Sequence, residues 1–166
     1  MAQSGKLKRN ILLSVVTFFG TGLISKKMPG TVGSLFATIT VLILPKSCVY
    51  TFILAVILFC LGWFCCELYI PKFETNRDPA YIVIDEACGI FVGASIIYLF
   101  ELHAFFSIIV NFVLFRIFDI LKPSPIKFLE EYCKNRKTIV SLGVMIDDIV
   151  AAIFASFAQI VFLGNI

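Results

Sequence analysis

The sequence has little charge and a single histidine, and each shortage excludes a class of protein. Charged residues make up only 15% of the chain, against about a quarter in ordinary soluble domains. The net charge is +3 and the basic residues are scattered, so the chain offers no basic groove of the kind that binds nucleic acid. His103 stands alone, which excludes a site built from several histidines.

The six cysteines form no recognisable pattern. No two of them are spaced as Cys-x-x-Cys, and none is followed six residues later by arginine. A zinc site, a dithiol redox motif and a cysteine nucleophile of the Cys-x5-Arg type are therefore not predicted. We interpret these cysteines as small apolar residues.

Apolar residues, in contrast, make up 60% of the chain, and the mean hydropathy is +0.99. A helix needs about 20 apolar residues to cross a bilayer. Residues 1–166 are predicted to form a single membrane-embedded domain: an all-α integral membrane protein with about five transmembrane helices. The first apolar run is short and follows a basic leader, so we expect an interfacial or re-entrant segment there. The six runs are Ile11 to Ile24, Val32 to Leu44, Val49 to Ile70, Tyr81 to Phe100, Ala104 to Leu121 and Ile139 to Leu163.

Threading five spans alternately through a membrane places nearly all basic residues on one side. Twelve lysines and arginines fall in the N-terminal leader and in the connections 25–31, 71–79 and 122–138, while Lys46 alone falls on the opposite side. Basic connections remain in the cytoplasm. The side with the twelve basic residues is therefore predicted to be cytoplasmic.

Five carboxylates lie within or at the ends of the apolar runs, where charge is costly and marks a functional site. In the threaded topology all five fall at a similar depth near the cytoplasmic face. Left unpaired, they would cost on the order of 10 kcal/mol. An alternative is that they are helix-end acids held in salt bridges, which fits the adjacent pair in the last run least well. The five are Asp85, Glu86, Asp119, Asp147 and Asp148.

Two cations accompany these acids along the chain. Arg116 and Lys122 lie three residues before and after Asp119, and they share one helix face with it if the helix continues through Lys122. Two cations against five acids leave about three negative charges, and buried charge must be paired or bound to metal. Oxygen ligands without histidine favour Mg²⁺, with Mn²⁺ next.

A glycine-rich loop precedes the second apolar run, with the sequence Pro29-Gly30-Thr31-Val32-Gly33-Ser34 after Lys26 and Lys27. Backbone N–H groups at a helix N-terminus, with hydroxyls and a lysine beside them, suit a phosphate. We predict phosphate binding by Lys27, Thr31 and Ser34. The alternative is an ordinary helix start, since Pro-Gly before threonine is common there.

Four blocks of sequence, in order along nearly the whole chain, resemble the phosphatidylglycerophosphatase A family. The blocks are Gly22-Leu23 with Pro29 to Ser34, Ile84-Asp85-Glu86 with Gly89, Phe115 to Asp119 with Lys122-Pro123 and Pro125-Ile126, and Gly143 to Ala151. The resemblance implies Mg²⁺-dependent hydrolysis of phosphatidylglycerophosphate to phosphatidylglycerol and phosphate, in phospholipid biosynthesis. It also implies a multi-pass protein of the bacterial cytoplasmic (inner) membrane with a membrane lipid as substrate.

The hypothesis for the site assigns a role to each residue. Asp85, Asp119, Asp147 and Asp148 hold metal, and Glu86 binds metal or acts as the base. Arg116, Lys122 and the loop with Thr31 and Ser34 hold phosphate, and either a metal-activated water or one of the acids attacks phosphorus, the water being preferred.

Two rival functions also use acids within a membrane. A CDP-alcohol phosphotransferase is an alternative, although the sequence has no Asp-Gly-x-x-Ala-Arg element. A small cation transporter is another, although no internal repeat supports two inverted halves.

Overall fold

The computed structural model describes residues 2–73, 79–102, 105–124, 126, 128 and 140–163, and every regular element in these ranges is a helix. The prediction of an all-helical fold is confirmed. The charged connections 74–78 and 129–139, and His103, lie outside the described residues. The elements are α1 (Ala2–Val16), η1 (Thr21–Leu23), α2 (Pro29–Ile43), α3 (Cys48–Phe73), α4 (Ile84–Leu99), α5 (Phe105–Leu121) and α7 (Val140–Leu163).

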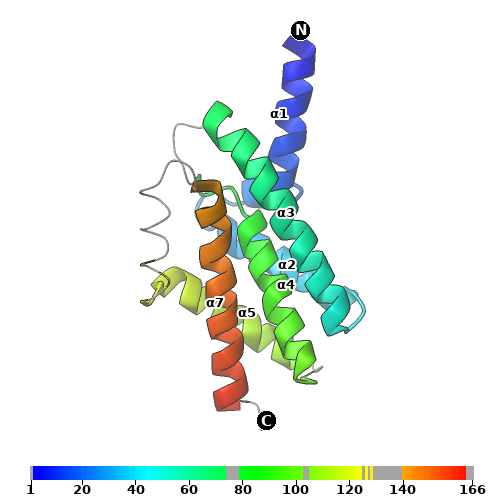
Figure 1. Cartoon of the computed structure of the whole chain (residues 1–166), viewed down its shortest axis with the longest axis vertical. Helices are drawn as coiled ribbons and strands as arrows, with labels where there is room; N and C mark the ends of the chain where they lie inside the picture. Colours follow the sequence, from blue (N-terminus) through cyan, green and yellow to red (C-terminus); the bar gives the residue numbers. More distant parts are fainter. Residues whose placement is uncertain are drawn as a thin grey trace.

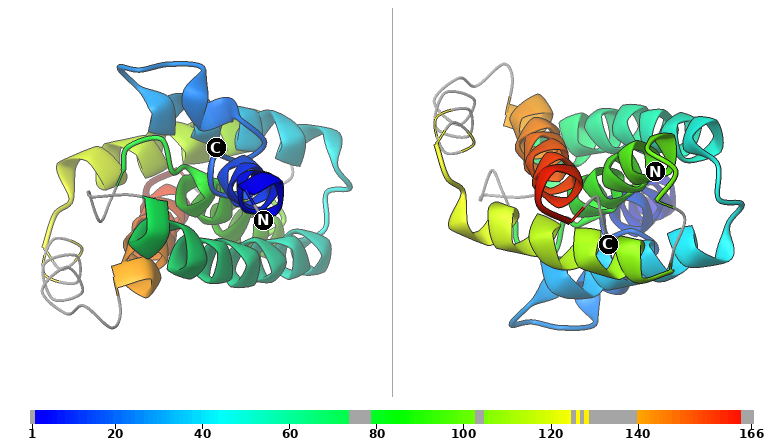
Figure 2. Two further views of the ribbon diagram at one scale, coloured as in Figure 1. Left: turned by 90° about the horizontal axis from the view of Figure 1, so that it is seen from above. Right: turned by 90° about the horizontal axis from the view of Figure 1, so that it is seen from below.

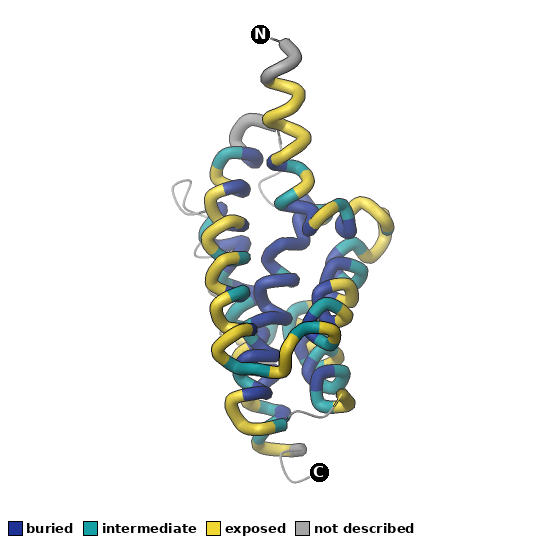
Figure 3. The backbone as a smooth tube through the Cα atoms, turned by 90° about the vertical axis from the view of Figure 1, so that its right-hand side faces the viewer, coloured by how far each residue is buried: buried dark blue, intermediate teal, exposed yellow. Residues whose placement is uncertain are grey.

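Helix α4 forms the centre of the bundle. It packs against α2, α3, α5 and α7, and Figure 2 shows it between α3 and α5 in both views. Twelve of its sixteen residues are buried, and Figure 3 shows the buried residues gathered along the middle of the molecule. Small residues permit this packing: a Cβ at Gly89 would lie 2.8 Å from the Phe115 ring and 3.1 Å from the carbonyl oxygen of Asp148.

In the described part of the chain, two helices are long and apolar enough to cross a membrane, over Cys48–Ile70 of α3 and Ser141–Phe162 of α7. Only 22% of the apolar window of α3 is buried in the protein, and large side chains such as Phe52 and Phe64 are exposed along it. An exposed apolar face of this size fits lipid better than water.

One predicted span is clearly shorter than its apolar run. For the run Tyr81 to Phe100, the helix itself covers only Ile84–Leu99, about 24 Å at 1.5 Å per residue. Residues 79–83 form a turn instead, in which the Ile82 N–H donates to the Pro79 carbonyl at 2.9 Å. The Val83 N–H donates to Val16 at 3.0 Å, which ties the start of α4 to the end of α1.

The N-terminal apolar run is divided between two elements. Helix α1 begins inside the basic leader and ends at Val16, and the chain then turns sharply, with positive φ at Phe18, Phe19 and Gly20. Residues 5–11 of α1 are exposed, and the helix projects beyond the rest of the bundle (Figure 1). The predicted apolar segment from Ile11 to Ile24 is therefore not one continuous element.

Helices α4 and α7 begin, and α5 ends, toward the end of the bundle from which α1 projects (Figure 1). This arrangement brings together the segments that carry the five acids.

Candidate active site

A polar cavity of about 350 Å³ lies where α2, α4 and α7 begin and α5 ends. Nine of the ten residues predicted from the sequence to form a site line it. The nine are Lys27, Thr31, Asp85, Glu86, Arg116, Asp119, Lys122, Asp147 and Asp148. The structure thus brings into one cavity residues that are up to 121 positions apart in the chain (148 − 27).

Asp85 and Glu86 occupy the first turn of α4. Acidic side chains are favoured there because the helix N-terminus carries a partial positive charge. The Asp85 Oδ1 atom accepts a hydrogen bond of 3.0 Å from the Glu86 N–H, which fixes the carboxylate of Asp85 at the helix start. Asp85 is only 8% exposed, so its charge is largely removed from solvent.

Asp147 and Asp148 lie two turns into α7 and are 8% and 4% exposed. Carboxylate oxygens of Asp85, Glu86 and Asp148 lie within 4.8 Å of one another, and Asp119 lies beside Asp148. The Oε2 atom of Glu86 and the Oδ2 atom of Asp148 are buried and accept no hydrogen bond from the residues that the structure describes. Buried acceptors of this kind call for a partner, either a proton or a cation.

Arg116 connects the acids of α4 and α5. Its Nη1 atom lies 2.7 Å from the carboxylate of Asp119 and 3.9 Å from that of Glu86. Asp119 lies three residues after Arg116 on the same helix, as the sequence spacing predicts. The guanidinium group is therefore placed between two of the acids rather than in solvent.

Lys122 lies at the end of α5 and reaches across to α7, where its Nζ atom lies 2.8 Å from Asp147 Oδ2. The expectation that Lys122 shares a helix face with Asp119 requires α5 to continue through Lys122, and it does not. Helix α5 ends at Leu121, and Lys122 has φ of 41°. This left-handed conformation is unusual for a side-chain-bearing residue and occurs where the surroundings impose it. Pro123 follows and cannot continue the helix.

Ser34 is the one predicted residue outside the lining of the cavity. It is fully buried, its hydroxyl donates to the Gly30 carbonyl at 2.7 Å, and it accepts a 3.2 Å hydrogen bond from Arg116 Nη1. Ser34 therefore helps to position the Arg116 side chain and does not itself line the cavity. Lys27 and Thr31, by contrast, lie on the cavity wall at the start of α2, where the first-turn N–H groups have no helical partner.

Gly30 has a spatial role that its place in the sequence motif does not reveal. A Cβ at this position would collide with Glu86 Oε1 and would lie 3.3 Å from Arg116 Nη2. The missing side chain lets the carboxylate of Glu86 lie against the first turn of α2. Only the packing of α2 on α4 shows this requirement.

The cavity has an excess of negative charge. Among the described residues, five carboxylates and three basic side chains line it, so two negative charges remain when all of these are ionised (5 − 3). A site of this composition can hold a cation between its acids and an anionic group beside its basic residues.

The fold and the cavity together define an apolar helical bundle with an acidic, enzyme-like site at one end. Residues 14–163 match the phosphatidylglycerophosphatase A family, and the chain belongs to this family. The resemblance seen in the sequence is confirmed.

Named relatives cover most of the chain. Phosphatidylglycerophosphatase A of Haemophilus influenzae is 37% identical over 161 residues, covering 93% of each chain. Phosphatidylglycerophosphatase A of Escherichia coli is 32% identical over 154 residues, covering 89% of this chain and 80% of the relative. A Bacteroides thetaiotaomicron protein with a provisional phosphatidylinositol-3-phosphatase name is 31% identical over 158 residues, covering 90% and 92%. No solved structure matches.

Proposed function

We propose that this chain is a phosphoric monoester hydrolase that converts phosphatidylglycerophosphate into phosphatidylglycerol and inorganic phosphate. The observation that carries this proposal is one cavity in which basic side chains lie beside buried carboxylate oxygens that have no hydrogen-bond partner among the described residues. Membership of the phosphatidylglycerophosphatase A family supports the same substrate.

The substrate phosphate is held by the basic side of the cavity. Arg116 offers a planar set of donors to the phosphate oxygens, and Lys122 and Lys27 add point charges at the rim. Thr31 and the first turn of α2 supply a hydroxyl and backbone N–H groups. Ser34 binds no phosphate in this scheme; it positions Arg116 through its 3.2 Å hydrogen bond.

The acidic side of the cavity fits Mg²⁺. Asp85, Glu86 and Asp148 each offer an oxygen within 4.8 Å of the others, and two of these residues carry an oxygen without a protein partner. Asp119 and Asp147 complete the acidic set. Bound Mg²⁺, or Mn²⁺ in its place, would neutralise the acids and draw electron density from the phosphate oxygens.

Each residue of the site then has its own role in hydrolysis. Glu86 accepts a proton from a water molecule whose oxygen attacks phosphorus in line with the ester bond. The bond between phosphorus and the glycerol oxygen breaks, that oxygen takes a proton from solvent as phosphatidylglycerol leaves, and Glu86 returns its proton to solvent. Arg116 and Lys122 hold the equatorial oxygens while their negative charge is redistributed.

The enzyme crosses the bacterial cytoplasmic membrane about five times, with the cavity toward the cytoplasm. The twelve-to-one distribution of basic residues supports this topology. Single cysteines at the exposed positions Lys26 and Lys46, in a protein without native cysteines, test it. Lys26→Cys should react with a membrane-impermeant reagent only from the cytoplasm and Lys46→Cys only from outside. Reaction of both from one side would overturn the five-span arrangement.

Purified protein tests the activity when it is incubated with Mg²⁺ and one lipid at a time. Phosphate release from phosphatidylglycerophosphate is the expected result. Faster release from phosphatidylinositol 3-phosphate would change the assigned substrate. A CDP-linked lipid with an alcohol acceptor should give no CMP, and its release would favour a phosphotransferase. No reaction with any of these lipids would leave the cation transporter as the better reading.

A further inference from the structure

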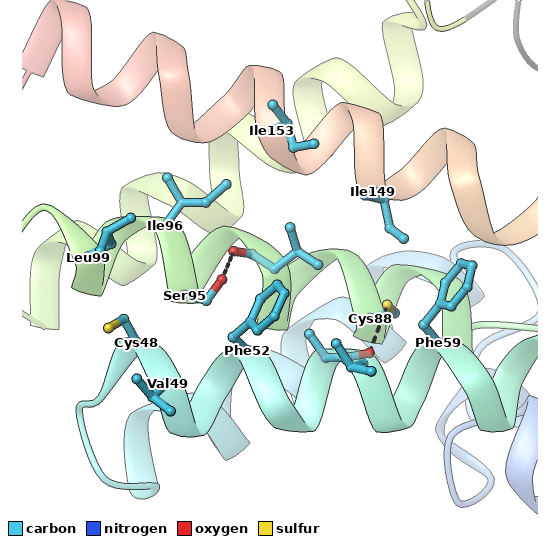
Figure 4. Close-up of a pocket in the computed structure, with 13 residues that line it drawn as sticks. Cys48, Val49, Phe52, Phe59, Cys88, Ser95, Ile96, Leu99, Ile149 and Ile153 are labelled. Carbon is cyan, nitrogen blue, oxygen red and sulfur yellow. Dashed lines mark hydrogen bonds between the residues drawn. The ribbon is translucent and has the colours of Figure 1, made fainter.

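A second cavity, quite different from the acidic one, lies on the side of the bundle between α3, α4 and α7 (Figure 4). It is an open groove of about 630 Å³. Phe52 and Phe59 of α3, Ile96 of α4, and Ile149 and Ile153 of α7 form its walls. It lies on an apolar surface and is separate from the nine acidic, basic and hydroxyl residues of the site.

Two polar groups of the groove are hydrogen-bonded to backbone carbonyls of the protein. Figure 4 shows the Ser95 hydroxyl bonded to the Val92 carbonyl, at 2.7 Å, and the Cys88 thiol bonded to the Ala55 carbonyl, at 3.5 Å. Neither group is left to bind a polar ligand. The groove therefore suits a purely apolar occupant.

The length of the groove fits a hydrocarbon chain. It runs from Cys88 to Leu99 on α4 and from Cys48 to Phe59 on α3, about 16 Å in each case at 1.5 Å per residue. The length equals about half of the 30 Å hydrocarbon core, the depth of one leaflet.

One end of the groove adjoins the acidic site through two helices. On α4, Cys88 lies one turn beyond Asp85, and its thiol is within electrostatic reach of Asp85 and Asp148. On α7, the lining residue Ile149 directly follows Asp148. From there the groove extends along α3 and α4 away from the acidic site. A lipid with its phosphate in the acidic cavity would have a tail of suitable length close to this groove.

We propose that the groove between α3, α4 and α7 binds one acyl chain of the lipid substrate while its phosphate occupies the acidic cavity. This inference rests on the proposed function. The tail moves from lipid into the groove, not from water, so little hydrophobic free energy is gained. The groove instead orients the lipid, and its loss should lower kcat/KM for long-chain substrate about tenfold.

Filling the groove tests this assignment. Ala55→Phe and Ser95→Phe each add a ring at a small residue of the groove. Ile57→Phe adds a ring at an exposed position on α3 that does not line it. Each variant is assayed with dipalmitoyl and dihexanoyl phosphatidylglycerophosphate. We expect the two groove variants to lose about tenfold in kcat/KM for the long lipid and to keep wild-type rates with the short one, and Ile57→Phe to match wild type with both.

The outcomes separate the two proposals. A wild-type protein that hydrolyses neither lipid overturns the proposed function and this inference with it. A wild type active on both lipids, with groove variants that treat the two alike, overturns the acyl-chain site alone. A photoreactive amino acid at Phe52 gives an independent readout: an adduct with the lipid supports the proposal. An adduct with a second copy of the chain, and none with lipid, contradicts it.

Discussion

Helices α4, α5 and α7 carry two buried polar clusters that differ in charge. The acidic cluster lies where α4 and α7 begin and α5 ends, and it contains charged groups with unpartnered oxygens. The neutral cluster lies further from that end of the bundle. There Asn111 Nδ2 donates to Ser156 Oγ at 3.1 Å, and Gln159 Nε2 donates to the Ser107 carbonyl at 2.9 Å.

The difference indicates what each cluster is for. Neutral amide and hydroxyl groups that bond across helices hold an apolar bundle together at modest gain, on average about 0.6 kcal/mol for each bond. Buried carboxylates that surround one another destabilise the bundle until a cation or substrate joins them. We therefore expect the neutral cluster to stabilise the fold, and we propose that the acidic cluster serves the reaction at a cost in stability.

Removal of divalent metal should have the largest effect and should act on the acidic cluster alone. We expect chelation by EDTA to abolish phosphate release and added Mg²⁺ to restore it. Mg²⁺ should also raise the melting temperature of the wild-type protein, since a ligand that binds only the folded state stabilises it. Full activity after thorough chelation would remove metal from the mechanism.

Substitution of the α7 acids should come next. Asp147→Asn and Asp148→Asn keep the size of the side chain and remove a charge, so turnover should fall about 1,000-fold. Apo Asp148→Asn should melt no lower than wild type, because repulsion between adjacent acids is relieved. Apo Asp147→Asn should melt lower, because it also loses the 2.8 Å ion pair with Lys122. Phosphate release and melting temperature, each with and without Mg²⁺, measure both effects. Near-normal turnover in both variants would place the metal on another helix.

Gly30→Ala should give an intermediate effect by moving an acid without removing it. The added Cβ collides with Glu86 Oε1, so the carboxylate must leave its place beside Arg116, and kcat should fall roughly 10- to 100-fold. Gly5→Ala is the matched control, because a Cβ there meets nothing within 4 Å. Equal rates for the two variants would show that the position of Glu86 does not matter.

Ser156→Ala should have the smallest effect and should appear in stability only. The change removes the acceptor of Asn111 Nδ2 in the neutral cluster, so the free energy of unfolding should fall by about 1 kcal/mol. Turnover with phosphatidylglycerophosphate should stay at the wild-type value at a temperature well below melting. A loss of turnover comparable to that of Asp148→Asn would show that the neutral cluster also contributes to activity.

The site was predictable to a large extent because buried charge is conspicuous in an apolar sequence. Asp85, Asp119 and Asp148 stand out against their neighbours, and alternate threading of the apolar runs places them at one end. The neutral cluster was not predicted. Asn111, Ser156 and Gln159 also interrupt apolar runs, and this pattern could have revealed them, although uncharged polar residues are a weaker indication.

The sequence by itself determined the helical class of the fold, its apolar surface and the convergence of the acids. Composition, and the order of apolar runs and charged residues along the chain, are enough to predict these features. Only the tertiary structure decided that α5 ends before Lys122, that Lys122 pairs with Asp147, and that Ser34 serves Arg116 instead of the cavity. It also decided why residue 30 must lack a side chain. These features depend on which atoms of different helices meet, and contact between helices is set by packing in three dimensions, which spacing along one chain does not specify.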